Sequence, residues 1–181
     1  MLTGRTSLDV GGRNVVEEAR NMEIRRLQTA GDAEICARMM SGSEPYLTLR
    51  RDYDACLKVV SDPLKESYVV RLNGGIVGIL VIVMNGALTG YIQSICIAPE
   101  FRGRGIGSQL MAFAERRVFR EAPNVFLMVS SFNHGAQRLY RRLGYEVIGE
   151  LKDFIVSGHS EILLRKTTGT VSDFKRSCLS M

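Results

Sequence analysis

The chain has 181 residues, of which 45% are hydrophobic and 24% are charged, a composition typical of one soluble globular domain. It contains no apolar run of about 18 residues, so a transmembrane helix is not expected. The net charge of +5 is compatible with an anionic ligand or a nucleic acid, and equally with a mildly basic surface.

The cysteines and histidines are too few and too scattered for a structural metal site. The four cysteines, at positions 36, 56, 96 and 178, form no CxxC pair, and the only histidines are His134 and His159. We therefore expect no bound metal and a reducing, cytoplasmic location. Residues 1–21 lack an apolar stretch and contain acidic residues, so they are interpreted as an N-terminal extension and not as a signal or transit peptide.

The first predicted elements are a strand and two helices. Met22–Leu27 alternates loosely between apolar and polar residues, as a strand does. Asp32 is the predicted N-cap of a helix that continues through Met40. After a loop, Asp52 is expected to cap a second helix. Asp62-Pro63 ends that helix, because the residue before a proline disfavours the helical conformation.

The middle of the chain predicts three antiparallel strands joined by tight turns. Ser67–Leu72 and Ile76–Met84 flank Asn73-Gly74, a strong signal for a hairpin turn in which both central residues have positive φ. Asn85-Gly86 marks a second turn, and Leu88–Ile97 is expected to be the third strand.

The C-terminal half predicts helices that alternate with strands. Apolar residues at helical spacing from Ile106 to Val118 predict a helix directly after a glycine-rich loop. A short strand is expected at Val125–Val129, and Asn133 is expected to cap a further helix. Gly144 stands where a glycine commonly ends a helix.

The last predicted elements are two closing strands, Tyr145–Leu151 and Glu161–Arg165. The resulting order, β-α-α-β-β-β-α-β-α-β-β, indicates an α+β fold with a mixed sheet. The predicted domain occupies residues 22–166 and leaves residues 167–181 as a C-terminal tail.

The segment RGRGIGS, which runs from Arg102 to Ser108, places three glycines and two arginines at the start of a predicted helix. Free N–H groups and a partial positive charge at a helix start bind phosphate, and glycines let the backbone approach it closely. A Walker loop is excluded because no lysine follows the glycines. A dinucleotide fingerprint fits poorly because the loop reads GxGxG after an antiparallel meander. The remaining pattern, [QR]-x-x-G-x-[GA], is matched by Arg102, Gly105 and Gly107.

Together with its flanking segments, this loop resembles the GNAT acyltransferase superfamily. The segment YIQSICIAPEF before the loop is similar to the family's fourth strand. The segment VFLMVSSFNHGAQRLYRRLGYEVIGE resembles a downstream region in which the family carries four residues in order, here Asn133, Ala136, Tyr140 and Gly144. The resemblance covers roughly residues 68–165. It implies the GNAT fold, in which helices flank a mixed, mostly antiparallel central sheet.

The resemblance implies acetyl-CoA as cosubstrate. The pyrophosphate is expected on backbone N–H groups of the glycine loop, and the pantetheine arm along the main chain of the preceding strand, where an N–H also holds the developing oxyanion. The arginine side chains are equally explained as surface charges, and Asn133 as a plain helix cap. The cofactor-binding residues so implied are Ile95, Cys96, Ile97, Arg102, Gly103, Arg104, Gly105, Ile106, Gly107, Ser108, Asn133 and Tyr140.

Tyr140 is the implied catalytic residue. In the family this tyrosine protonates the departing thiolate, and a phenol with a pKa near 10 carries its proton at neutral pH; a packed helix aromatic explains the same residue. Met128 stands where some relatives that acetylate protein N-termini carry a glutamate, which argues against that acceptor. The general base is left open among Glu44, Tyr46, Gln93, His159, Glu161 and water.

The expected function is transfer of an acetyl group from acetyl-CoA to a primary amine of a protein or small molecule, by direct attack on the thioester. Cys96 is expected to be a buried apolar residue and not a nucleophile. The alternative is a non-catalytic acyl-CoA-binding regulatory domain. A nucleic acid is not an expected partner, since the chain has no tryptophan and no aromatic–basic platform. A membrane is not expected either, since no apolar run is long enough to cross one. The class of amine and the presence or absence of a homodimer are left open.

Overall fold

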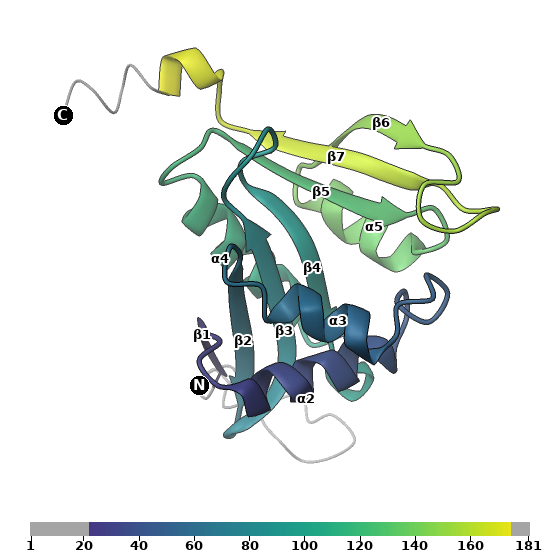
Figure 1. The fold of residues 1–181 in the computed structure, drawn as a ribbon. Coiled ribbons are helices and arrows are strands. Elements are labelled where there is room, and N and C mark those ends of the chain that lie inside the picture. The colour runs from purple at the N-terminus through teal and green to yellow at the C-terminus, as the bar shows by residue number, and fades with distance from the viewer. Residues whose placement is uncertain (1–21, 175–181) are drawn as a thin grey trace, which may run out of the picture.

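The computed structural model describes residues 22–174 (Figure 1). The order of strands and helices agrees with the prediction, with a short 3₁₀ helix, η1, added before the glycine loop. The predicted extension at residues 1–21 lies outside the described residues. In the predicted tail, residues 171–174 are helical. The elements are β1 (Met22–Arg26), α2 (Ala30–Ser41), α3 (Tyr53–Val60), β2 (Glu66–Leu72), β3 (Gly75–Val83), β4 (Tyr91–Ile97), η1 (Pro99–Phe101), α4 (Ile106–Val118), β5 (Asn124–Ser130), α5 (His134–Arg142), β6 (Glu146–Leu151) and β7 (Glu161–Thr167).

The strands form one sheet in the order β1-β2-β3-β4-β5-β7-β6. Every neighbouring pair is antiparallel except β4 and β5, so the predicted mixed, mostly antiparallel sheet is confirmed. The parallel pair is short, because β4 and β5 are in register only at Tyr91↔Phe126 and Ile92↔Leu127. Beyond these residues the two strands spread apart, as Figure 1 shows. This divergence positions the site described below.

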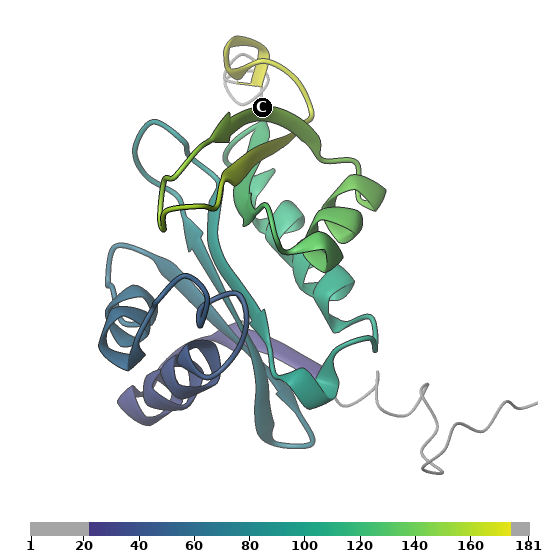
Figure 2. The same cartoon turned by 90° about the vertical axis from the view of Figure 1, so that its right-hand side faces the viewer.

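Helices cover both faces of the sheet (Figures 1 and 2). On one face, α2 and α3 pack over a core that includes Val69, Ile79 and Val81. On the other face, α4 packs over a larger core that includes Leu80 and Ile82. The alternation along β3 explains this division, since successive side chains of a strand point to opposite faces. Truncation of such fully buried aliphatic residues to alanine costs about 2–5 kcal/mol.

The predicted cap of the first helix is wrong by one turn. Thr29 is the N-cap of α2, and its Oγ1 accepts a hydrogen bond from the Asp32 N–H at 3.0 Å. Asp32 lies within the first turn, where a carboxylate interacts favourably with the helix dipole. Its Oδ1 pairs with Arg71 Nη2 on β2 at 2.7 Å. The aspartate therefore ties α2 to the sheet, while threonine supplies the cap.

Of the two turns predicted between β2, β3 and β4, the first is found as expected and the second is longer than expected. Asn73 and Gly74 have φ angles of 51° and 83°, which confirms the hairpin turn. The strand expected from Leu88 begins only at Tyr91. The reason lies in Gly90, which has a φ of 88° and donates its N–H to the Val83 carbonyl at 3.0 Å. The connection between β3 and β4 is therefore longer than the sequence predicted.

Candidate active site

The glycine loop between η1 and α4 presents the first N–H groups of a helix. Gly103 and Gly105 have φ angles of 77° and 80°, which glycine adopts without strain. A Cβ added at either one would meet nothing within 4 Å, so this side of the loop is open. Gly105 is the N-cap of α4, and none of the described residues caps this helix with a side chain. The N–H groups of Ile106, Gly107 and Ser108 therefore lack intrahelical acceptors and suit an anion such as a diphosphate.

The two arginines of this loop hold it in place. Arg102 donates from Nε to the Ile97 carbonyl at 3.0 Å and from Nη2 to the Glu44 carbonyl at 3.2 Å. Arg104 donates from Nη2 to the Glu100 carbonyl at 3.0 Å. These bonds attach the loop to the end of β4 and to the connection between α2 and α3. The backbone N–H groups at the start of α4 are thus better placed than these side chains to bind an anion.

One edge of β4 is open beside this loop. Ile95, Cys96 and Ile97 lie beyond the last pair with β5, and their other neighbour is β3. The Cys96 side chain points to the α2 side, where its Sγ lies 3.4 Å from Ser43 Oγ. Burial raises the pKa of the Cys96 thiol, which opposes formation of a thiolate. The expectation that Cys96 is a buried residue is confirmed.

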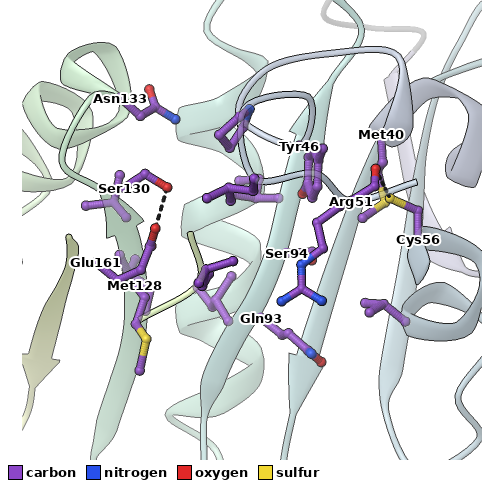
Figure 3. Close-up of a pocket in the computed structure, with 18 of the residues that line it drawn as sticks. Met40, Tyr46, Arg51, Cys56, Gln93, Ser94, Met128, Ser130, Asn133 and Glu161 are labelled. Atoms are coloured by element: carbon purple, nitrogen blue, oxygen red, sulfur yellow. Dashed lines mark hydrogen bonds between the residues drawn. The ribbon is translucent and has the colours of Figure 1, made fainter. Parts of the chain in front are cut away.

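A cavity of about 290 Å³ lies where β4 and β5 diverge. Figure 3 shows side chains that approach it from β4, β5, β7 and the connection between α2 and α3. Most of its lining is apolar or aromatic, as in typical small-molecule sites. The predicted residues that it brings together are Tyr46, Gln93, Ile95, Asn133, Tyr140 and Glu161, and Met128 lines it as well.

Tyr140 lines this cavity from α5. Asn133 is the N-cap of that helix, as predicted, and its Oδ1 accepts a hydrogen bond from the Ala136 N–H at 3.2 Å. Tyr140 is 5% exposed, and its burial raises the pKa of the phenol. The hydroxyl is therefore protonated at neutral pH. A protonated phenol in a partly desolvated cavity is suited to donate a proton to a departing anion.

Glu161 lines the same cavity from the start of β7. It is 4% exposed, and its Oε1 accepts a hydrogen bond from Ser130 Oγ at 2.6 Å. Burial raises the pKa of this carboxyl group, while Ser130, Arg51 and His159 oppose the rise. A carboxylate with a raised pKa is a better proton acceptor than an ordinary glutamate.

The other candidates for the general base are separated by their positions. Glu44 is exposed and does not line the cavity. Its carboxylate accepts hydrogen bonds from the N–H and Oγ1 of Thr48. His159 packs against Phe132 with ring centroids 4.8 Å apart and also lies outside the cavity. Gln93 does line it, and its buried Oε1 has no hydrogen-bond partner among the described residues.

Tyr46 also lines the cavity, but its phenol is a poor general base because it stays protonated at neutral pH. Burial raises its pKa, and a side-chain hydrogen bond with Ser94 only partly opposes this rise. A neutral phenol does not accept a proton from an ammonium group. Glu161 is therefore the most basic of the predicted candidates that line the cavity.

Sequence reasoning missed Ser130 and Arg51. Ser130 contacts Glu161 only because β5 and β7 pair in register at Ser130↔Glu161, although the two residues are far apart in the sequence. Arg51 directly precedes the cap residue Asp52 and lines the cavity. The one usable signal was the cluster of charged residues between the first two helices.

Within residues 22–174, no group of three or more His, Cys, Asp and Glu side chains is arranged to hold a metal ion. The helices of this region are also too short or too polar to cross a membrane.

Among known proteins, the chain is similar in sequence to several that are named N-acetyltransferases. The chain is 28% identical over 126 residues to the spermidine N(1)-acetyltransferase of Escherichia coli, covering 67% of this chain and 68% of that protein. It is 27% identical over 152 residues to the N-alpha-acetyltransferase RimI of Mycobacterium tuberculosis, covering 80% and 92% of the two chains.

A similar solved structure is an aminoglycoside 6'-N-acetyltransferase complexed with coenzyme A. It superposes with a TM-score of 0.69 at 15% identity, over 82% of this chain and 98% of that one. At this identity the likeness concerns the fold. Residues 28–145 match the family model described as the acetyltransferase (GNAT) family. The chain therefore belongs to the GNAT family of acetyltransferases, as its sequence motifs predicted.

Proposed function

We propose that the protein transfers the acetyl group of acetyl-CoA to the nitrogen of a primary amine. The observation that carries this proposal is the cavity between β4 and β5, which Tyr140 and Glu161 line together. One is a protonated phenol, and the other is a carboxylate with a raised pKa. Acyl transfer to an amine requires both a proton donor and a proton acceptor.

The residues that would hold acetyl-CoA lie beside this cavity. The N–H groups of Ile106, Gly107 and Ser108 would bind the diphosphate, because they are free of side-chain caps from the described residues and lie at the positive end of α4. The open edge of β4 at Ile95–Ile97 would pair with the amide groups of the pantetheine arm. When bound, acetyl-CoA supplies the activated acetyl thioester.

Glu161 would remove a proton from the ammonium form of the acceptor, which has a pKa well above neutrality for most amines. The free amine then attacks the thioester carbonyl, a C–N bond forms and the C–S bond breaks. Tyr140 would protonate the departing thiolate and recover its proton from the new amide nitrogen. One proton per turnover leaves through Glu161 to solvent, so atoms and charges balance.

A non-catalytic acyl-CoA-binding domain is the competing function. It requires the glycine loop but gives no role to a paired acid and base. Incubation of the full chain with acetyl-CoA and a panel of primary amines distinguishes the two, with free thiol and N-acetylated product as readouts. The enzyme releases both in equal amounts. Binding of acetyl-CoA by calorimetry, without thiol release for any amine, contradicts the proposed reaction and favours the binding domain.

A further inference from the structure

One cationic side chain that lines the cavity, Arg51, has no role in the proposed acetyl transfer. Arg51 and Glu161 are the two charged side chains among the described residues that line it. Figure 3 shows the Arg51 guanidinium reaching across the cavity toward the strand that carries Gln93 and Ser94, while Glu161 approaches from the other side. The backbone N–H of Arg51 donates to the Tyr46 carbonyl at 2.9 Å, which fixes the start of this side chain.

The Arg51 guanidinium has no acidic partner within residues 22–174. It lies close enough to Glu161 to lower the pKa of that carboxyl group, but the two do not form an ion pair. The carboxylate next to it in sequence, Asp52, is occupied as the N-cap of α3, where it accepts from the Ala55 N–H at 2.8 Å. Arg51 therefore lines the cavity with a planar guanidinium, a group of five N–H donors, that no carboxylate of the described residues pairs with.

We infer that the acceptor is an α-amino acid with an apolar side chain, whose carboxylate binds Arg51 while its amino group faces Glu161. This inference rests on the proposed function. The geometry of a guanidinium matches a carboxylate with two parallel hydrogen bonds. One cation and one anion on opposite walls complement a molecule that carries one charge of each sign.

The remaining walls define the third part of this ligand. Leu49, Phe154 and Ile155 line the cavity and also the wider hollow that continues from it past Arg51. Phe154, in the connection between β6 and β7, is 58% exposed. A large apolar side chain at the rim of a cavity gains contact when an apolar ligand covers it. The side chain of the amino acid would lie here.

A polyamine fits these walls less well. Each additional ammonium group needs an acidic partner or water, and a buried like charge is unfavourable. Glu161 is the single acid of the cavity among the described residues, and Arg51 would repel a second ammonium group. Asp52 lines the adjoining hollow, but its carboxylate already accepts the Ala55 N–H as the cap of α3. Spermidine is therefore the most informative competing acceptor.

The inference is tested with the full-length chain and sets of acceptors that differ only in the group next to the amino group. Leucine, methionine and phenylalanine are each compared with their amides and their decarboxylated amines, alongside spermidine and a tetrapeptide with a free N-terminus. Initial rates of thiol release give kcat/KM. The free amino acid is expected to exceed its amide and its decarboxylated amine by about tenfold or more, the discrimination typical of a lost charge-assisted hydrogen bond.

The variant Arg51→Gln removes the charge and keeps most of the side-chain length. It is expected to bring the ratio of kcat/KM between amino acid and decarboxylated amine close to one. Arg116→Gln, at an exposed residue of α4 that lines neither the cavity nor the wider hollow, is the matched control and is expected to keep the wild-type ratio. Calorimetry of the amino acid on protein saturated with coenzyme A gives a second readout, in which Arg51→Gln loses the heat of binding.

The possible outcomes distinguish a wrong acceptor class from a wrong proposed function. Acetylation of decarboxylated amines, spermidine or the tetrapeptide at rates equal to or above those of the amino acids overturns the inference and leaves the proposed function standing. An unchanged ratio in Arg51→Gln overturns it as well. Absence of thiol release with every amine contradicts the proposed function itself.

Discussion

The Ser130 hydroxyl, on the last residue of β5, donates a hydrogen bond of 2.6 Å to Oε1 of Glu161, on the first residue of β7. The two residues are register partners in the antiparallel pair. Met128, the residue that the sequence resemblance matches to a glutamate of some relatives, lies two residues before Ser130 on the same strand. In this chain an acidic side chain thus reaches the cavity from the neighbouring strand.

Replacement of Tyr140 by phenylalanine should slow acetyl transfer strongly and leave acetyl-CoA affinity nearly intact. Loss of a general acid typically costs a factor of about 10² to 10⁴ in rate. The measurement is kcat from thiol release, together with Kd for acetyl-CoA by calorimetry. Tyr145→Phe is the matched control, because this buried ring lies 6.0 Å from the Tyr140 ring but does not line the cavity. Equal turnover in Tyr140→Phe and wild type would place the proton donor elsewhere.

Replacement of Glu161 by glutamine should remove the acidic limb of the pH profile. Burial raises the pKa of Glu161, and Arg51, His159 and Ser130 oppose that rise, while Tyr91 on β4 also faces the carboxylate. Because the base must be ionised, kcat/KM should increase with pH above about 4.3, the ordinary glutamate pKa. Glu150→Gln, on an exposed face of β6, should keep the wild-type profile. If the acidic limb of the kcat/KM profile persists in Glu161→Gln, Glu161 is not the general base.

The same pKa shift makes a prediction about stability. A carboxyl group whose pKa is raised by folding binds its proton more tightly in the folded state. Its contribution to stability is therefore present below the unfolded pKa of about 4.3 and is lost as pH rises through the folded pKa. Glutamine still accepts the Ser130 hydrogen bond without a buried charge. Glu161→Gln should thus match or exceed wild type in free energy of unfolding at neutral pH, with the difference vanishing at low pH.

Urea unfolding followed by circular dichroism measures this difference, since the chain contains no tryptophan. A loss of more than about 1 kcal/mol at neutral pH in Glu161→Gln would mean that the ionised carboxylate stabilises the fold. That result would contradict a raised pKa for Glu161 in the folded protein.

A negative charge in the first turn of α4 should weaken acetyl-CoA binding without harming the helix. A Cβ at Gly107 would lie 3.5 Å from Leu139 Cδ2, an ordinary contact, so Gly107→Glu fits the fold. The carboxylate would interact favourably with the helix dipole but repel a diphosphate at the same N–H groups. We expect Kd to rise by at least about tenfold, which corresponds to about 1.4 kcal/mol.

Gln109→Glu adds the same charge at an exposed position further along α4 and should change Kd little. Calorimetry with coenzyme A measures both variants. An unchanged Kd in Gly107→Glu would remove the diphosphate from this helix terminus.

Loss of the Arg102 side chain should affect both halves of the site. Its hydrogen bonds to the Ile97 and Glu44 carbonyls join the glycine loop to the connection that carries Tyr46 and Arg51. Arg102→Met should raise KM for acetyl-CoA and for the acceptor, with a stability loss of only about 1 kcal/mol because the side chain is exposed. If KM changes for acetyl-CoA alone, the arginine does not couple the two segments.

Local signals in the sequence predicted most of the fold. The caps Asp52 and Asn133 and the Asn73-Gly74 turn are decided by residues within a few positions of one another, and all are found as predicted. Asp32 was misassigned because its partner, Arg71, belongs to a strand that is distant in the sequence. A short polar side chain near a helix start does not reveal whether it caps the backbone or binds a remote cation.

The site was predictable to the extent that its chemistry is local. The glycine loop and Tyr140 follow from motifs, whereas the Ser130–Glu161 pair and the approach of Arg51 depend on strand register and on the course of a connecting segment. For the same reason the sequence alone did not separate Glu161 from Glu44 or His159. Burial and hydrogen-bond partners make that distinction.

The most direct test of the central claim is a single measurement of acetyl transfer by the purified full chain. Acetyl-CoA and the amino acid panel are incubated with the protein, and free thiol and N-acetylated product are quantified together by mass spectrometry. We expect equal amounts of both products from the wild-type protein and a strong decrease of both in Tyr140→Phe. Saturable binding of acetyl-CoA without either product, across amino acids and all other primary amines, would contradict it.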